Sequence, residues 1–248
     1  ISNIAAIRRR VGFIASIFLV IAFVSVPYVY DQSDRIHEDA MLPELGYYVK
    51  MMVAFVGLLL VATMGGLIDR GYERDIGAGK DRFDALRASS GEFHALLLLS
   101  LTGVMLICEA RDLIWLFLAL ELVSLPTYVM VAMSRWSRKA QEAAMKYFFL
   151  GALSAALMLY GFALLYASAG TLVLQEMTEI FALQQLTGGL STLAQIGMLL
   201  AIFGLLYKIA AAPMHLYAPD VYQGAASAVT AFLAFVPKTA GIIALIIL

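Results

Sequence analysis

Two ionisable side chains of opposite charge, Lys208 and Glu121, stand inside runs of apolar residues. Lys208 lies in the apolar run 199–215, and Pro213 follows it five residues later. A proline inside a helix removes one backbone hydrogen bond and clashes with the carbonyl group four residues earlier, which is that of Ile209. We therefore predict a helix that breaks between Lys208 and Pro213, directly beside a buried ammonium group.

The chemistry that such a pair favours is the movement of a proton or an ion. Burial disfavours the charged form of a carboxylate or an amine, whereas a nearby opposite charge favours it. A Glu–Lys pair in a low-dielectric site is therefore poised, because separating the two groups promotes the release of a proton. A charged side chain inside a membrane span is costly and marks a functional site by default. The alternative is a static buried salt bridge, such as one between Glu121 and Lys238, that only fixes helix packing.

Three further residues are candidates for proton translocation. Lys238 directly follows a proline in the last apolar run, and we expect it to share a polar layer near the membrane midplane with Lys208. Lys146 and His215 are candidate uptake or branch groups. Each has a structural alternative: Lys146 can pair with Glu142, four residues earlier on one helix face, and His215 can form a hydrogen bond at the membrane interface.

The composition predicts an all-α polytopic membrane protein. Of the 248 residues, 62% are hydrophobic and 14% are charged, and the mean hydropathy is +0.86. The apolar residues come in runs of about 20, which is long enough to cross a bilayer. The net charge of −1 gives no indication of a nucleic-acid partner. The single cysteine excludes a disulfide within the chain, and no group of His, Cys and carboxylate residues has the spacing of a metal site.

We expect about seven membrane spans in this chain. They lie near residues 8–29, 45–68, 92–110, 112–133, 140–168, 191–216 and 226–248. Of the 17 Lys and Arg residues, we place only Lys146, Lys208 and Lys238 within spans. We expect loops at 169–190 and at 217–225, where a proline and a glycine indicate a turn-rich link.

The charge of the links between spans alternates from one side to the other. The links 69–90 and 134–139 are basic, whereas the link 31–44 is acidic and the link 169–190 holds no Lys or Arg. The three arginines that precede the first span, residues 8–10, fall on the same side as the basic links. This is the positive-inside pattern, so we expect residue 1 to face the cytoplasm or, in an organelle, the matrix.

Several ordered motifs resemble the antiporter-like subunits of respiratory complex I, the NADH–quinone oxidoreductase. They cover roughly residues 90–248 and include the segments 112–126, 142–148, 208–215, 219–224 and 236–238. The forms Leu-Glu-Leu-x-Ser-Leu-Pro and Pro-Asp-Val-Tyr-Gln-Gly are similar to the subunit N branch of this family, called subunit 2 in mitochondria. The first two spans resemble the family in type only.

The resemblance implies a fold with two five-helix units repeated in inverted topology. Residues 91–248 would form the first unit, residues 1–90 would supply two N-terminal helices and a basic loop, and the second unit would be absent. The chain begins without a methionine and ends inside an apolar run, as a fragment would. In the first unit Glu121 would face Lys208, and Lys238 would pass protons toward the centre of the membrane arm.

The resemblance also implies a function, namely proton translocation by a membrane-arm subunit of NADH–quinone oxidoreductase. NADH, FMN, iron–sulfur clusters and quinone would bind to partner subunits, and this chain would hold no cofactor or metal. The expected partners are the other membrane-arm subunits, including a neighbouring antiporter-like subunit, and the lipid bilayer. Two alternatives remain: a subunit of a multisubunit cation/proton antiporter, and a purely structural spacer in a membrane arm.

Overall fold

In this computed structural model, nearly all of the described backbone is helical. The structure describes residues 10–32, 43–64, 75–76, 78–80, 89–135 and 137–248. Over these ranges no β-strand occurs, and one isolated β-bridge joins Asp112 to Val173. Most of the acidic link 31–44, most of the basic link 69–90 and the first two arginines lie outside the described residues.

Six helices among those described are long and apolar enough to cross a membrane. They are α2 (Val11–Gln32), α4 (Pro43–Met64), α6 (Ser90–Ile107), α7 (Leu113–Ser134), α8 (Arg138–Ala169) and α12 (Ser227–Ile247). The remaining expected span is α10 (Thr192–Lys208), which is continued after a break by the 3-10 helix η1 (Met214–Tyr217) and by α11 (Ala218–Gly224). Counted with this interrupted helix, the described residues contain the seven spans that we expected.

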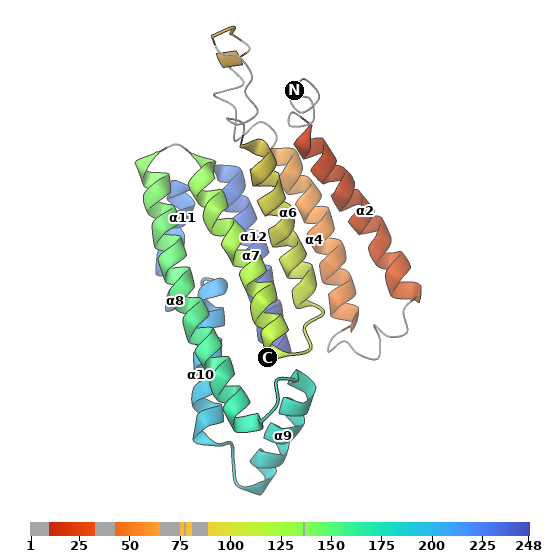
Figure 1. Ribbon diagram of the computed structural model, residues 1–248, viewed down its shortest axis with the longest axis vertical. Coiled ribbons are helices and arrows are strands. Elements are labelled where there is room, and N and C mark those ends of the chain that lie inside the picture. The colour runs from red at the N-terminus through yellow and green to blue at the C-terminus, as the bar shows by residue number, and fades with distance from the viewer. Residues whose placement is uncertain (1–9, 33–42, 65–74, 77, 81–88, 136) are drawn as a thin grey trace.

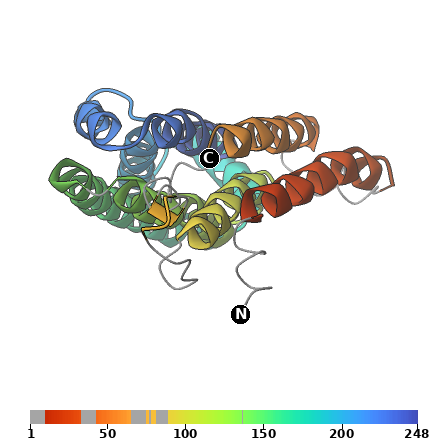
Figure 2. The same cartoon turned by 90° about the horizontal axis from the view of Figure 1, so that it is seen from above.

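The spanning helices form a bundle in which α12 packs against α6, α7 and α10 (Figures 1 and 2). The start of α2, the start of α6 and the end of α7 lie at one end of the bundle, whereas the end of α2, the start of α4 and the end of α6 lie at the other (Figure 1). This alternation agrees with the predicted order of the spans. Which end faces the cytoplasm stays a prediction from the charge of the links.

Short polar side chains determine where three of the helices begin. Asp112, Ser137 and Ser191 each accept a hydrogen bond from the backbone N–H three residues later, at 2.7, 3.1 and 3.2 Å. These bonds satisfy donors that the first turns of α7, α8 and α10 leave free. The helices that carry the candidate residues are therefore fixed at their starts by local sequence.

Two segments that we expected to be loops are helical. The segment 169–190 contains α9 (Leu174–Thr187), and the segment 217–225 contains α11 with Pro219 in its first turn. A proline is tolerated there because the first N–H groups of a helix have no intrahelical partner. The predictions were wrong because neither short helix is apolar enough to stand out as a span.

The helices α8 and α10 approach each other along glycine residues. A Cβ atom added to Gly161 would lie 2.5 Å from the backbone nitrogen of Ala201 and 2.7 Å from the carbonyl oxygen of Gly197. Ser154 Oγ donates to the carbonyl oxygen of Gly204 at 2.8 Å across the same contact. These glycines thus allow the two helix backbones to pack closely.

We expect Gly161→Ala to destabilise the protein by about 1–3 kcal/mol, because the added carbon meets backbone atoms that cannot move without separating the two helices. The matched control is Gly91→Ala, since Gly91 lies in α6 and an added Cβ there has no neighbour within 4 Å. The measurement is the thermal unfolding midpoint of the full-length protein in detergent. Equal midpoints for the two variants would contradict the close packing.

Candidate functional site

The sixth predicted span is interrupted between Lys208 and Pro213, so the predicted helix break is confirmed. The helix α10 ends at Lys208, and Ala210 has a φ of 56°, a left-handed conformation that non-glycine residues rarely adopt. The hydroxyl of Tyr217 donates to the carbonyl oxygen of Tyr207 at 3.0 Å, across the break. A carbonyl in the last turn of α10 is thereby satisfied inside the protein, which is the condition for an interrupted helix in a membrane.

The ammonium group of Lys208 is buried and contacts two side chains of α7. Its Nζ donates to Glu121 Oε1 at 2.8 Å and to Ser124 Oγ at 2.7 Å. The side chain of Lys208 is 4% exposed and that of Glu121 is 15% exposed. Glu121 and Ser124 are three residues apart, so they lie on the same face of α7. The structure thus brings the predicted Glu–Lys partners together, and their role in proton movement stays a prediction.

Lys238 lies half-buried on α12, near the other half of the broken helix. Its Nζ is 5.6 Å from the centre of the Tyr222 ring, within reach of a cation–π interaction. One turn further along α12, a Cβ added to Gly241 would lie 3.2 Å from Lys208 Cβ. The segments that carry Lys208 and Lys238 therefore pack against each other, with Lys238 about one helical turn from the point of contact. The two side chains, however, contact different residues.

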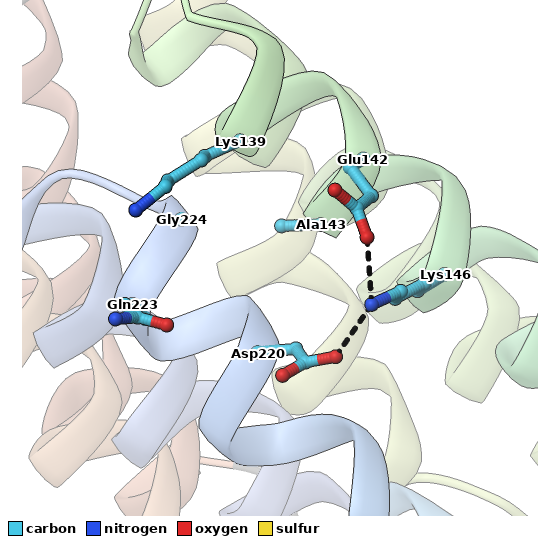
Figure 3. Close-up of a pocket in the computed structure, with 7 residues that line it drawn as sticks. All are labelled: Lys139, Glu142, Ala143, Lys146, Asp220, Gln223 and Gly224. Atoms are coloured by element: carbon cyan, nitrogen blue, oxygen red, sulfur yellow. Dashed lines mark hydrogen bonds and ion pairs between the residues drawn. The ribbon is translucent and has the colours of Figure 1, made fainter.

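Lys146 is the centre of an ionic cluster that joins α8 to α11 (Figure 3). Its Nζ lies 2.8 Å from Glu142 Oε1, the pair that the i,i+4 spacing predicts, and 2.7 Å from Asp220 Oδ2. We call Glu142, Lys146 and Asp220 the Lys146 cluster; all three side chains are exposed. The cavity beside them, of about 130 Å³, is also lined by Lys139, Ala143, Gln223 and Gly224.

His215 does not join either group in the described part of the chain. It lies exposed in η1, two residues after the exposed Pro213. No hydrogen bond or ion pair of the described residues connects it with the Glu121–Lys208 pair or with the Lys146 cluster. Over the same residues, no group of three His, Cys, Asp or Glu side chains could hold a metal ion.

Three residues that form polar contacts between helices were not predicted from the sequence. Ser124 follows Glu121 by three residues, a spacing that would have pointed to it. Asp220 was placed in a link and was not connected with Lys146. Lys50 lies inside α4 and pairs with Glu109, so the prediction that only three Lys and Arg residues lie within spans is wrong.

The chain is similar in sequence to a family of membrane proteins and to named curated relatives. The family model described as NADH:quinone oxidoreductase/Mrp antiporter, transmembrane, matches residues 110–248. The NADH-quinone oxidoreductase subunit N of Trichlorobacter lovleyi is 44% identical over 156 residues, which cover 63% of this chain and 32% of that protein. The subunit N of Beutenbergia cavernae is 42% identical over 205 residues, which cover 79% and 38%. The chain thus spans about a third of the length of these relatives.

Solved structures have the same arrangement of helices. A chain of respiratory complex I from Thermus thermophilus with bound aureothin matches with a TM-score of 0.70 and 27% identity, over 99% of this chain and 52% of that one. A chain of the Mrp complex from a Dietzia species matches with a TM-score of 0.70 and 20% identity, over 97% and 43%. The second likeness concerns the fold alone.

Proposed function

The chain belongs to the NADH:quinone oxidoreductase/Mrp antiporter transmembrane family, and we propose that it acts in a proton-translocating subunit of an NADH–quinone oxidoreductase, of the subunit N type. The observation that carries the proposal is the buried Glu121–Lys208 pair at a break in a membrane helix. Relatives above 40% identity that bear the subunit N name support the choice within the family.

The pair can perform proton translocation by alternating between a closed and an open state. In the closed state Glu121 offsets the charge of Lys208, so the amine keeps its proton. When the carboxylate moves away, the buried ammonium loses this stabilisation and releases a proton to the next acceptor. Lys238 is the candidate acceptor, because two lysines in one low-dielectric region repel each other when both are protonated. The helix break supplies the local freedom for such a movement.

The proposal also assigns the organisation of the chain and its surroundings. The helices α6, α7, α8 and α12, with the interrupted α10–α11, would be the first five-helix unit, preceded by α2 and α4. The protein would lie in the inner membrane with residue 1 on the cytoplasmic side, among other membrane-arm subunits. NADH, FMN, iron–sulfur clusters and quinone would be bound by partner subunits, so that the work of this chain is proton movement alone.

A second candidate function is that of a subunit in a cation/proton antiporter, because the description of the matching family includes the Mrp antiporter. The two functions differ in what the protein assembles with. The test is to purify the full-length protein from its native membranes and to analyse the complex. We expect it to co-purify with subunits that carry FMN and iron–sulfur clusters and to reduce quinone with NADH. A complex without redox subunits that exchanges sodium ions for protons would overturn the proposal.

A further inference from the structure

A buried cluster of stacked tyrosines joins the helices that carry two ionic groups of this chain. The Lys146 cluster is exposed, whereas the Glu121–Lys208 pair is buried. Tyr147 directly follows Lys146 on α8, and Tyr207 directly precedes Lys208 on α10. The Tyr147 and Tyr217 rings are stacked at 5.5 Å between centres, and the Tyr207 and Tyr217 rings are stacked at 4.3 Å.

Most hydroxyl groups in this tyrosine cluster are used to satisfy the backbone. Tyr207 Oη donates to the carbonyl oxygen of Tyr147 at 3.1 Å, and Tyr217 Oη donates to that of Tyr207. Tyr147 Oη differs from these two, because it lies 3.2 Å from another hydroxyl, Thr127 Oγ1. Tyr147 is 5% exposed and Thr127 is 0% exposed, so this contact is made in the interior.

The direction of the hydrogen bond between these hydroxyls follows from the other contact of Thr127. Thr127 Oγ1 donates its hydrogen to the carbonyl oxygen of Ser124 at 2.6 Å. Since a threonine hydroxyl has a single hydrogen, Tyr147 Oη must be the donor to Thr127 Oγ1. Ser124 Oγ in turn accepts from Lys208 Nζ at 2.7 Å and donates its own hydrogen to the carbonyl oxygen of Leu120 at 2.9 Å. The hydroxyls of Tyr147, Thr127 and Ser124 therefore lie between α8 and the buried ammonium of Lys208, with direct contacts from Tyr147 to Thr127 and from Lys208 to Ser124.

We propose that Tyr147, Thr127 and Ser124 form the path along which a proton passes between the Lys146 cluster and Lys208. The inference rests on the proposed function, since it names the side chains that serve the Glu121–Lys208 pair. Ser124 and Thr127 are three residues apart on one face of α7, which places their Cβ atoms about 5–6 Å apart. The proposed path needs one water molecule between these two hydroxyls. It also needs water to reach the Tyr147 hydroxyl from the exposed Lys146 cluster.

The transfer conserves atoms and charge at every step. A proton from water at the Lys146 cluster binds to Tyr147 Oη, and the original phenolic proton leaves for Thr127 Oγ1. The threonine proton passes to the bridging water, the water passes one to Ser124 Oγ, and the serine proton binds to the neutral amine of Lys208. At each oxygen one O–H bond forms and one breaks, and no oxidant or reductant takes part. Rotation of the three hydroxyls restores the starting arrangement.

A purely structural role for the same residues is the competing explanation. A threonine hydroxyl that bonds a carbonyl three residues earlier can simply satisfy the backbone beside a kink, and Pro126 lies directly before Thr127. A structural role and a proton path make different predictions for proton movement. Thr127→Val keeps the shape but removes the hydroxyl, whereas Thr127→Ser keeps the hydroxyl and removes a methyl group.

The experiment uses the full-length protein in its assembled complex, in sealed membrane vesicles oxidising NADH. For Thr127→Val and Tyr147→Phe we expect normal assembly but a proton-translocation rate at least about tenfold lower, since a positioned proton-transfer group contributes about 10²-fold or more. The remaining rate is expected to show a larger solvent deuterium isotope effect than the wild type. Thr127→Ser should restore the rate, and Tyr160→Phe, on the exposed side of the same helix as Tyr147, should leave it unchanged.

Three results would overturn the path. They are wild-type rates in both hydroxyl-free variants, a Thr127→Ser rate as low as that of Thr127→Val, and a loss that merely follows the amount of assembled complex. If Tyr147→Phe assembles poorly, the comparison of Thr127→Val with Thr127→Ser decides alone. Lys208→Ala in the same vesicles distinguishes a failure of the proposed path from a failure of the proposed function. If Lys208→Ala is inactive while the hydroxyl-free variants translocate normally, only the path is wrong; if Lys208→Ala is normal, the proposed function fails.

Discussion

Glu121→Gln is expected to stop proton translocation and to destabilise the protein by about 3–5 kcal/mol, the usual cost of removing one partner of a buried ion pair. Glutamine has nearly the shape of glutamate, so packing around α7 is preserved. What is lost is the negative charge 2.8 Å from an ammonium group that is 4% exposed. Ser124 still accepts a hydrogen bond from Lys208, but a neutral hydroxyl does not replace a counter-charge.

Two measurements on the full-length protein test this expectation. One is the rate of NADH-driven proton translocation in vesicles, and the other is the thermal unfolding midpoint in detergent. The control is Glu179→Gln, which makes the same chemical change at an exposed position on α9. We expect the control to match the wild type in both measurements. Wild-type translocation by Glu121→Gln would remove Glu121 from the mechanism.

The sequence alone was sufficient to predict the broken helix and the buried pair. The break follows from a local effect, because Pro213 cannot donate a backbone hydrogen bond wherever it lies. The pair could be predicted because a charged side chain in an apolar span is energetically unfavourable unless it has a partner of opposite sign. The charge pattern alone left Lys238 open as a partner of Glu121, and the resemblance to the antiporter-like subunits indicated Lys208.

Contacts between distant parts of the chain could not be predicted in the same way. Lys146 and Asp220 are 74 residues apart, and Lys50 and Glu109 are 59 residues apart. Each pair depends on how two helices are placed side by side, and a surface charge has many possible partners. The position of His215 relative to these groups could not be predicted for the same reason, since the direction of the chain after the break is set by tertiary packing.

The hydroxyls of Thr127 and Tyr147 also gave no signal in the sequence. Threonine and tyrosine are frequent in membrane helices, where they satisfy backbone groups or lie at interfaces. The contact of these two hydroxyls requires that α7 and α8 face each other at a particular rotation. Only the structure supplies that rotation, through the edge-to-face packing of the Tyr128 and Tyr147 rings at 4.6 Å.

Lys208→Arg is expected to fail in proton translocation nearly as badly as Lys208→Ala. Arginine keeps a positive charge beside Glu121, but its guanidinium group does not lose a proton in proteins. A residue that only balances the charge of Glu121 is therefore replaced by arginine, whereas a residue that must release and regain a proton is not. The larger guanidinium also needs room in a buried site, so the amount of assembled complex has to be measured for each variant.

The most direct test of a proton-carrying Lys208 is the initial rate of proton translocation in membrane vesicles, compared among wild type, Lys208→Arg and Lys208→Ala at equal amounts of assembled complex. If the lysine carries the proton, both variants lose translocation, and the charge kept by arginine gives no recovery. If Lys208→Arg translocates protons at the wild-type rate while Lys208→Ala does not, Lys208 supplies only a fixed charge, and the proposed role is contradicted.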